Sequence, residues 1–192
     1  MPPSPEQHEI RAHIYSSQKK YIEAAEEWRQ ALKFSPGDRQ IREQLAISLK
    51  FSQDYGGALL LFQDLLRTDP ESTQLNYLVG DTLLELQRVE EATPFLRKVV
   101  ARDPKSLAAH KSLARAYLAV GKSADAIPHL KAALSVDEDG SLHYELGRAY
   151  QAHGQLALAR QMLSQYQEIH SKQEAEKQSL NQEMQITPPD ER

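Results

Sequence analysis

The chain of 192 residues contains no cysteine, which excludes disulfide bonds, cysteine metal ligands and a cysteine nucleophile. It also has no long apolar run. No stretch approaches the ~18 apolar residues of a membrane-spanning helix, so we expect no membrane insertion. The first ten residues have neither the basic nor the apolar segment of a secretory signal. We therefore expect a cytoplasmic protein, with the periplasm left open for a processed or truncated chain.

An excess of positive charge is missing as well. The 23 lysines and arginines are outnumbered by 27 aspartates and glutamates, for a net charge of −4. This balance argues against a nucleic-acid partner, which would require a basic face. Glycine-rich phosphate loops, Gly-x-Ser-x-Gly elbows and His-Glu-x-x-His motifs are also absent from the sequence. The sequence therefore predicts a protein without catalytic activity and without a cofactor.

An internal repeat is the main feature that is present. The alanines at 24, 58, 92 and 126 follow one another at intervals of 34 residues, and a further alanine at 159 comes one residue early. Large apolar residues stand four positions after each alanine, namely Trp28, Phe62, Leu96, Leu130 and Leu163. Periods of this length are typical of stacked repeat architectures. The period divides the chain into units of about 5–38, 39–72, 73–106, 107–139 and 140–170.

Each unit has the pattern of two amphipathic helices. The first helix of a unit carries small and large apolar residues at helical spacing, as in Leu113, Ala114, Tyr117 and Leu118. A short break follows, and in the second and third units the second helix ends before an Asp-Pro pair, which contains Pro70 or Pro104. No alternating run of β-branched residues suggests a strand. Because one helix pair cannot bury both of its faces, neighbouring units are expected to stack and share a core.

This pattern resembles the tetratricopeptide repeat. That family has Leu-Gly/Ala-x-x-Tyr in its first helix, as in Leu146-Gly147-x-x-Tyr150, and Ala-x-x-x-Phe-x-x-Ala…Pro in its second, as in Ala24-x-x-x-Trp28-x-x-Ala31…Pro36. The resemblance implies an all-α fold, a right-handed α-solenoid of stacked antiparallel helix pairs. We expect one five-repeat array over residues 1–170. Residues 171–192, rich in Glu, Gln and Lys, are expected to extend the last helix and to end in a frayed tail.

Three histidines raise the question of a metal site. His8, His110 and His143 occupy one repeat position, so the side chains of His110 and His143 should lie on neighbouring helices. A shared metal would also need carboxylate partners, and only Glu145 is close in sequence. We therefore favour a packing role for these histidines and predict no metal.

The resemblance places the binding surface on the first helix of each unit, because those helices line a concave groove in this family. The groove positions are acidic toward the first unit and basic toward the last. The residues that we expect to bind a partner are Tyr77, Leu78, Asp81, Lys111, Arg115, Tyr144 and Arg148. Arg115 and Arg148 occupy equivalent positions on neighbouring helices, so both could reach one carboxylate. Intramolecular ion pairs, of Arg115 with Asp81 and of Arg148 with Glu145, explain the same residues and stay open as an alternative.

The predicted function is a non-catalytic scaffold that binds a protein or peptide partner, with an acidic segment, in its concave groove. Two further classes stay open: an accessory region of a larger enzyme or of a secretion or assembly complex, and a self-associating structural protein, such as a homodimer. Some members of the family hold the acidic end of heat-shock chaperones with a Lys/Asn/Asn/Lys/Arg clamp. The corresponding positions hold Glu9, His13, Gln44, Gln74 and Leu78 in units 1–3. In units 3–5 they hold Tyr77, Asp81, Ser112, Ser141 and Glu145, so neither set matches and we exclude that clamp.

Overall fold

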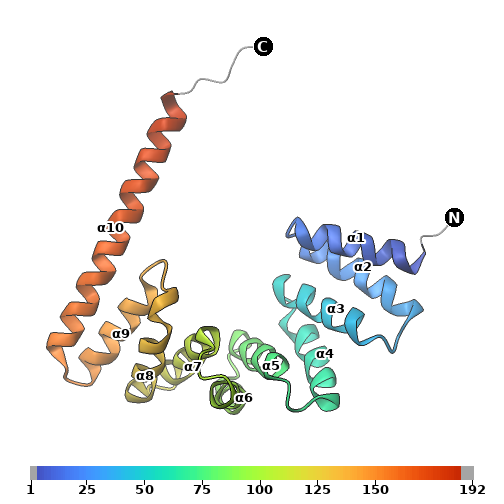
Figure 1. The fold of residues 1–192 in the computed structure, drawn as a ribbon, viewed down its shortest axis with the longest axis horizontal. Helices are drawn as coiled ribbons and strands as arrows, with labels where there is room; N and C mark the ends of the chain where they lie inside the picture. Colours follow the sequence, from blue (N-terminus) through green and yellow to red (C-terminus); the bar gives the residue numbers. More distant parts are fainter. Residues whose placement is uncertain (1–3, 187–192) are drawn as a thin grey trace. The chain divides into compact units, whose positions relative to one another are not determined.

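The computed structural model describes residues 4–186, and within that range its regular elements are all helices joined by short turns, with no strand (Figure 1). The elements are α1 (Pro5–Ser17), α2 (Tyr21–Phe34), α3 (Arg39–Phe51), α4 (Tyr55–Thr68), α5 (Thr73–Glu85), α6 (Val89–Arg102), α7 (Leu107–Ala119), α8 (Ser123–Ala133), the short 3₁₀ helix η1 (Leu134–Val136), α9 (Ser141–Ala152) and α10 (Leu156–Ile186). The predicted all-α fold class is confirmed. Each of the five sequence units holds two consecutive α-helices, in the order α1 and α2, α3 and α4, α5 and α6, α7 and α8, and α9 and α10.

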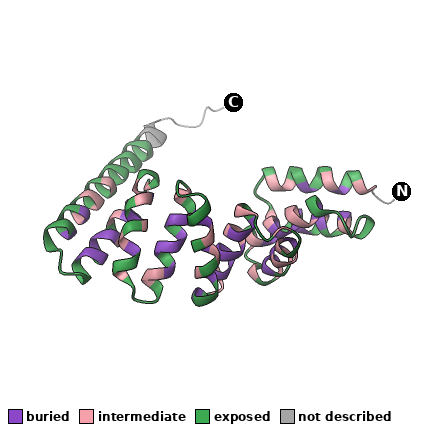
Figure 2. Ribbon diagram, turned by 60° about the horizontal axis from the view of Figure 1, so that its bottom comes forward, coloured by how far each residue is buried: buried purple, intermediate pink, exposed green. Residues whose placement is uncertain are grey.

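The chain forms two compact units, Met1–Ser112 and Leu113–Arg192, which we call the N-unit and the C-unit. In the N-unit, each helix from α1 to α5 contacts the next one along the chain. In the C-unit, α9 packs against both α8 and α10. Figure 2 shows the buried residues on the sides by which neighbouring helices within each unit face one another. Each helix therefore buries one face on its sequence neighbours, as expected of a stacked repeat.

Polar residues before the helices explain several of their first residues. Ser4 and Gln7 form a capping box at the start of α1, and the side chains of Asp38, Asp54 and Ser72 accept hydrogen bonds from the backbone at the starts of α3, α4 and α5. Each such bond satisfies a helix N–H that would otherwise lack a partner. Repeated caps therefore define where the helices begin.

Small residues allow the two helices of a unit to approach closely. Trp28 is only 1% exposed, and Ala12 and Ala24, the small residues of the same unit, are fully buried. Gly147 plays the same part in the last unit, because a Cβ atom there would lie 2.9 Å from Leu163 Cγ. Large side chains of the second helices are thus buried where the first helices have almost no side chain, which gives the dense packing of a core.

The connection between α8 and α9 departs from the repeat pattern. Instead of Asp-Pro it has Asp137, whose side chain is 1% exposed and accepts hydrogen bonds from the backbone N–H groups of Leu142 and His143. Gly140 precedes α9 with a φ of +78°, a left-handed conformation that favours glycine. Asp137 and Gly140 together determine where α9 begins.

Helix α10 extends beyond the last repeat to Ile186, and all of residues 171–182 are exposed. One hydrogen bond links this extension to the rest of the C-unit, from Gln173 Nε2 to the backbone oxygen of Glu138 at 2.8 Å. The frayed tail predicted for the end of the chain falls largely at residues 187–192, outside the described residues. The division into a 1–170 array and a 171–192 extension stays a prediction.

Candidate groove site in the C-unit

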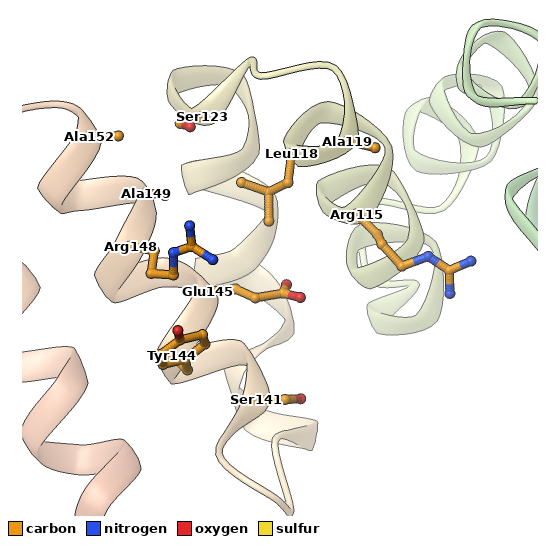
Figure 3. Close-up of a pocket in the computed structure, with 10 residues that line it drawn as sticks. All are labelled: Arg115, Leu118, Ala119, Ser123, Ser141, Tyr144, Glu145, Arg148, Ala149 and Ala152. Atoms are coloured by element: carbon orange, nitrogen blue, oxygen red, sulfur yellow. The ribbon is translucent and has the colours of Figure 1, made fainter. Parts of the chain in front are cut away.

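A cavity of about 510 Å³ opens on the C-unit between α7, α9 and the start of α8 (Figure 3). The residues that line it are Arg115, Leu118, Ala119, Ser123, Ser141, Tyr144, Glu145, Arg148, Ala149 and Ala152. Three of the residues predicted for partner binding, Arg115, Tyr144 and Arg148, are therefore in the wall of one cavity. We call this cavity the C-unit groove.

Arg148 provides the cationic group in the middle of the C-unit groove. Its guanidinium carbon lies 5.9 Å from the centre of the Tyr144 ring, one turn earlier on α9. A guanidinium at that distance over an aromatic face gains a cation–π attraction. Among the described residues the Arg148 side chain forms no ion pair. It therefore keeps its hydrogen-bond donors available to a ligand.

Tyr144 also contacts helix α10. Its ring centre lies 5.3 Å from that of Tyr166, which in turn lies 5.9 Å from His170. Tyr144 is still 42% exposed, so one part of the ring packs on α10 and another part faces the groove. The tilted ring contact with Tyr166 orients the aromatic surface over which Arg148 lies.

Glu145 lies between the two arginines in the view of Figure 3, and the Arg115 guanidinium points away from Arg148. The two guanidinium groups point apart in this arrangement, and their joint binding of one carboxylate stays a prediction. Glu145 and Arg115 both take part in polar interactions. A ligand carboxylate in the groove would therefore meet Arg148 first, and it would reach Arg115 only after that side chain had turned.

Helix α9 positions both Tyr144 and Arg148, and its first turn is tightly held. The carboxylate of Asp137 accepts from the backbone N–H groups of Leu142 at 3.1 Å and of His143 at 2.9 Å. It also lies 2.5 Å from His143 Nδ1. Three contacts to one buried carboxylate leave the start of α9 little freedom, so the groove residues one and two turns later are carried on a rigid element.

The remaining predicted site residues lie in the N-unit and do not line the C-unit groove. Tyr77 and Leu78 are half-buried on α5, and Lys111 is exposed on α7. Asp81, also on α5, is a buried residue. The predicted role of these four residues in one binding surface with the arginines stays a prediction.

The Asp81 carboxylate is engaged by two neighbours from other helices of the N-unit. Lys50 Nζ on α3 lies 2.8 Å from one oxygen, and the Ser112 hydroxyl donates to the other at 2.8 Å. The side chains of Lys50 and Asp81 are only 17% and 13% exposed. We therefore assign Asp81 to the packing of the N-unit and leave it out of the site proposed below.

The three histidines at the shared repeat position are all engaged within the protein. His8 Nδ1 lies 2.5 Å from Glu27 Oε2, His110 Nε2 lies 3.1 Å from the Pro104 carbonyl oxygen, and His143 contacts Asp137. Among the side chains of residues 4–182, no three histidines or carboxylates are grouped as metal ligands would be.

Sequence reasoning missed the small residues of the groove. Ala119 and Ala152 end in a methyl group and Ser123 in a small hydroxyl, and these short side chains leave space in the cavity that they line. Only a comparison of the repeats reveals that these side chains are small for their positions. The position of Ala119 and Ala152 holds Phe51 in the second unit, and the position of Ser123 holds Tyr21 in the first unit.

Comparison with protein families identifies the repeat. Models described as tetratricopeptide repeat match residues 52–117, 83–139 and 112–174, and together they span more than half of the chain. The chain belongs to the tetratricopeptide repeat family. A search of curated protein sequences found no match. Members of this family are generally non-catalytic scaffolds for protein interactions, so this chain is a protein-interaction scaffold by class.

Solved structures show the same fold. MamA 41-end from Desulfovibrio magneticus RS-1 superposes with a TM-score of 0.78 at 22% identity, covering 88% of this chain and 96% of that one. TTC0263, a thermophilic TPR protein of Thermus thermophilus, gives 0.63 at 19% identity, covering 88% and 93%. At such identities the likeness establishes the tetratricopeptide fold and nothing finer. No helix in the described part of the chain is long and apolar enough to cross a bilayer.

Proposed function

We propose that this tetratricopeptide-repeat protein binds an acidic segment of a protein partner in the C-unit groove. The observation that carries the proposal is Arg148, which lies over the Tyr144 ring in the wall of a 510 Å³ cavity without an ion pair among the described residues. A cavity of that size is in the range of ligand-binding clefts. The aromatic face beside a guanidinium suits an apolar side chain next to a carboxylate.

The charge of the lining supports an acidic partner. The titratable side chains in the wall are two arginines, one glutamate and one tyrosine, so the ionised groups sum to +1 at neutral pH. An arginine guanidinium offers a planar pair of donors to a carboxylate. Charge-assisted hydrogen bonds of this kind contribute about 1.5–3 kcal/mol. Binding should therefore weaken as salt is added, since the groove is open to solvent.

Selection from a library of random twelve-residue peptides displayed on phage would test this proposal on the whole chain. We expect the selected peptides to be rich in Asp and Glu. Their affinity should fall about 10- to 100-fold in Arg148→Ala, because the variant loses about 1.5–3 kcal/mol. The matched control is Arg160→Ala, an exposed arginine of the C-unit that does not line the groove.

Two results would contradict the proposal. One is a set of peptides that binds wild type and Arg148→Ala with equal affinity. The other is a set without acidic residues whose binding does not respond to salt. Circular dichroism of both variants shows that any loss is not due to unfolding.

A further inference from the structure

In a repeat protein the same structural position occurs once in every repeat. Here a pair of such positions holds two aromatic rings in the N-unit and two small side chains in the C-unit. In the N-unit, the Phe51 ring from the end of α3 stacks on Tyr21 from the start of α2, with ring centres 4.8 Å apart and an angle of 23° between the rings. Phe51 is the thirteenth residue of the second unit, and Tyr21 is the seventeenth residue of the first unit. The corresponding pair in the last two units is Ala152 and Ser123.

Both members of that second pair line the C-unit groove. In Figure 3 they lie at one end of the groove with Ala119, whereas Tyr144 and Ser141 lie at the other end and Arg148 lies between them. We call the end formed by Ala119, Ser123 and Ala152 the alanine socket. The space that two aromatic rings occupy in the N-unit is therefore open in the C-unit.

We infer that the alanine socket receives an aromatic side chain of the bound partner, which takes the place that Phe51 occupies in the N-unit. The inference rests on the proposed function, since the same partner segment places its carboxylate on Arg148. The occupant is a short peptide segment with a phenylalanine-like side chain close to an acidic group.

The spacing on α9 supports this pairing of groups. Arg148 and Ala152 are four residues apart on one helix, so they are separated by about 6 Å along its axis. Adjacent residues of a bound peptide can span that separation with a ring and a carboxylate. A phenyl ring that entered the socket would leave water for a surface of alanine side chains and the half-buried Leu118, which is favourable for any apolar group.

The N-unit also shows that this position accepts an aromatic ring beside a positive charge. Lys50 Nζ lies 5.7 Å from the centre of the Phe51 ring, and Phe51 is 56% exposed. A ring in the alanine socket would likewise have a cation close by, at Arg148. A flat ring is preferred there over a branched aliphatic group, because it gains a cation–π attraction in addition to burial.

The test uses N-acetylphenylalanine, which carries a phenyl ring and a carboxylate, with N-acetylleucine as the aliphatic comparison. Both are titrated into the whole chain, and the methyl resonances of Ala119, Ala149 and Ala152 are followed by NMR. We expect N-acetylphenylalanine to bind with a Kd in the millimolar range, to shift those methyls by its ring current, and to bind at least threefold tighter than N-acetylleucine.

Two variants make the test specific. Ala152→Phe places in the socket the residue type that the second unit has at this position. The new ring should occupy the space and abolish the binding of N-acetylphenylalanine, while helicity is retained. Phe51→Ala opens the equivalent space in the N-unit, and it should create a second weak site whose ligand shifts the Tyr21 resonances. Equal binding of both probes, or unchanged binding to Ala152→Phe, would overturn the inference.

The display experiment separates the two proposals. Acidic peptides that depend on Arg148 but contain no aromatic residue would support the groove and refute the socket. Peptides that do not depend on Arg148 would refute the groove, whatever the probe titration shows.

Discussion

Lys50 and Asp81 form the most deeply placed ion pair between lysine and carboxylate in the described part of the N-unit. The two side chains meet from α3 and α5 at 2.8 Å, and Ser112 donates a further hydrogen bond to the carboxylate. Removing one partner of a largely buried pair leaves a charge without compensation, which costs more than the intact pair contributes. The pair therefore acts mainly as a constraint on how α3 and α5 pack.

Lys50→Ala should lower the free energy of unfolding by about 2 kcal/mol, because Asp81 keeps only its bond to Ser112. Urea unfolding followed by the fluorescence of Trp28, the single tryptophan, measures the change in the N-unit. The double variant Lys50→Met with Asp81→Asn removes both charges and should recover most of the loss. A single variant as stable as wild type would show that the pair is solvated in solution.

At the scale of the element, α9 is the helix on which the groove depends, and its start is determined by a residue outside it. Asp137 lies four residues before Ser141, yet its carboxylate accepts from the second and third residues of the helix. This replaces an ordinary cap, since Gly140 at the N-cap has no side chain to accept a bond.

Asp137→Ala should destabilise the C-unit by about 2 kcal/mol, because two helix N–H groups and the His143 side chain lose a buried acceptor. Hydrogen exchange of the Leu142 and His143 amides should accelerate more than exchange later in α9. Glu138→Ala is the matched control, since Glu138 is exposed and contributes only its backbone oxygen to Gln173. Equal exchange rates in the two variants would contradict the capping role.

In the molecule as a whole, the most closely packed helices of the described chain follow one another in the sequence, and its buried residues are not gathered in one central core. Repeat proteins gain stability from each repeat and from its interfaces with adjacent repeats, so a local defect does not weaken every repeat equally. The buried cluster around Leu130, Leu142 and Leu146 belongs to the C-unit alone, whereas Trp28 reports on the N-unit.

Gly140→Ala tests this organisation. The new Cβ atom would lie 3.0 Å from Tyr166 Cδ2, in addition to the strain of a φ of +78°, and we expect a loss of about 1–2 kcal/mol in the C-unit. The unfolding transition seen by circular dichroism should shift more than the transition seen by Trp28 fluorescence. Gly121→Ala has a similar φ of +73° but open space around the new atom, so it should cost less. Coincident shifts of both probes would mean that the chain unfolds as one cooperative unit.

The 34-residue pattern was enough to predict the all-α repeat fold and the family. The reason is that a 34-residue period repeats one set of packing contacts, so residues such as Ala24 and Trp28 have few alternatives to the core. Arg115, Tyr144 and Arg148 could be assigned to one surface on the same basis.

Which groups meet within that surface depends on how the helices pack. The period does not specify rotamers or the space between helices, so it could not show that Lys50 engages Asp81, that Arg148 lies over Tyr144, or that Arg115 points away. It also could not show that alanine and serine at two repeat positions leave an open socket. A cavity depends on every side chain around it, and those side chains come together only when the helices pack.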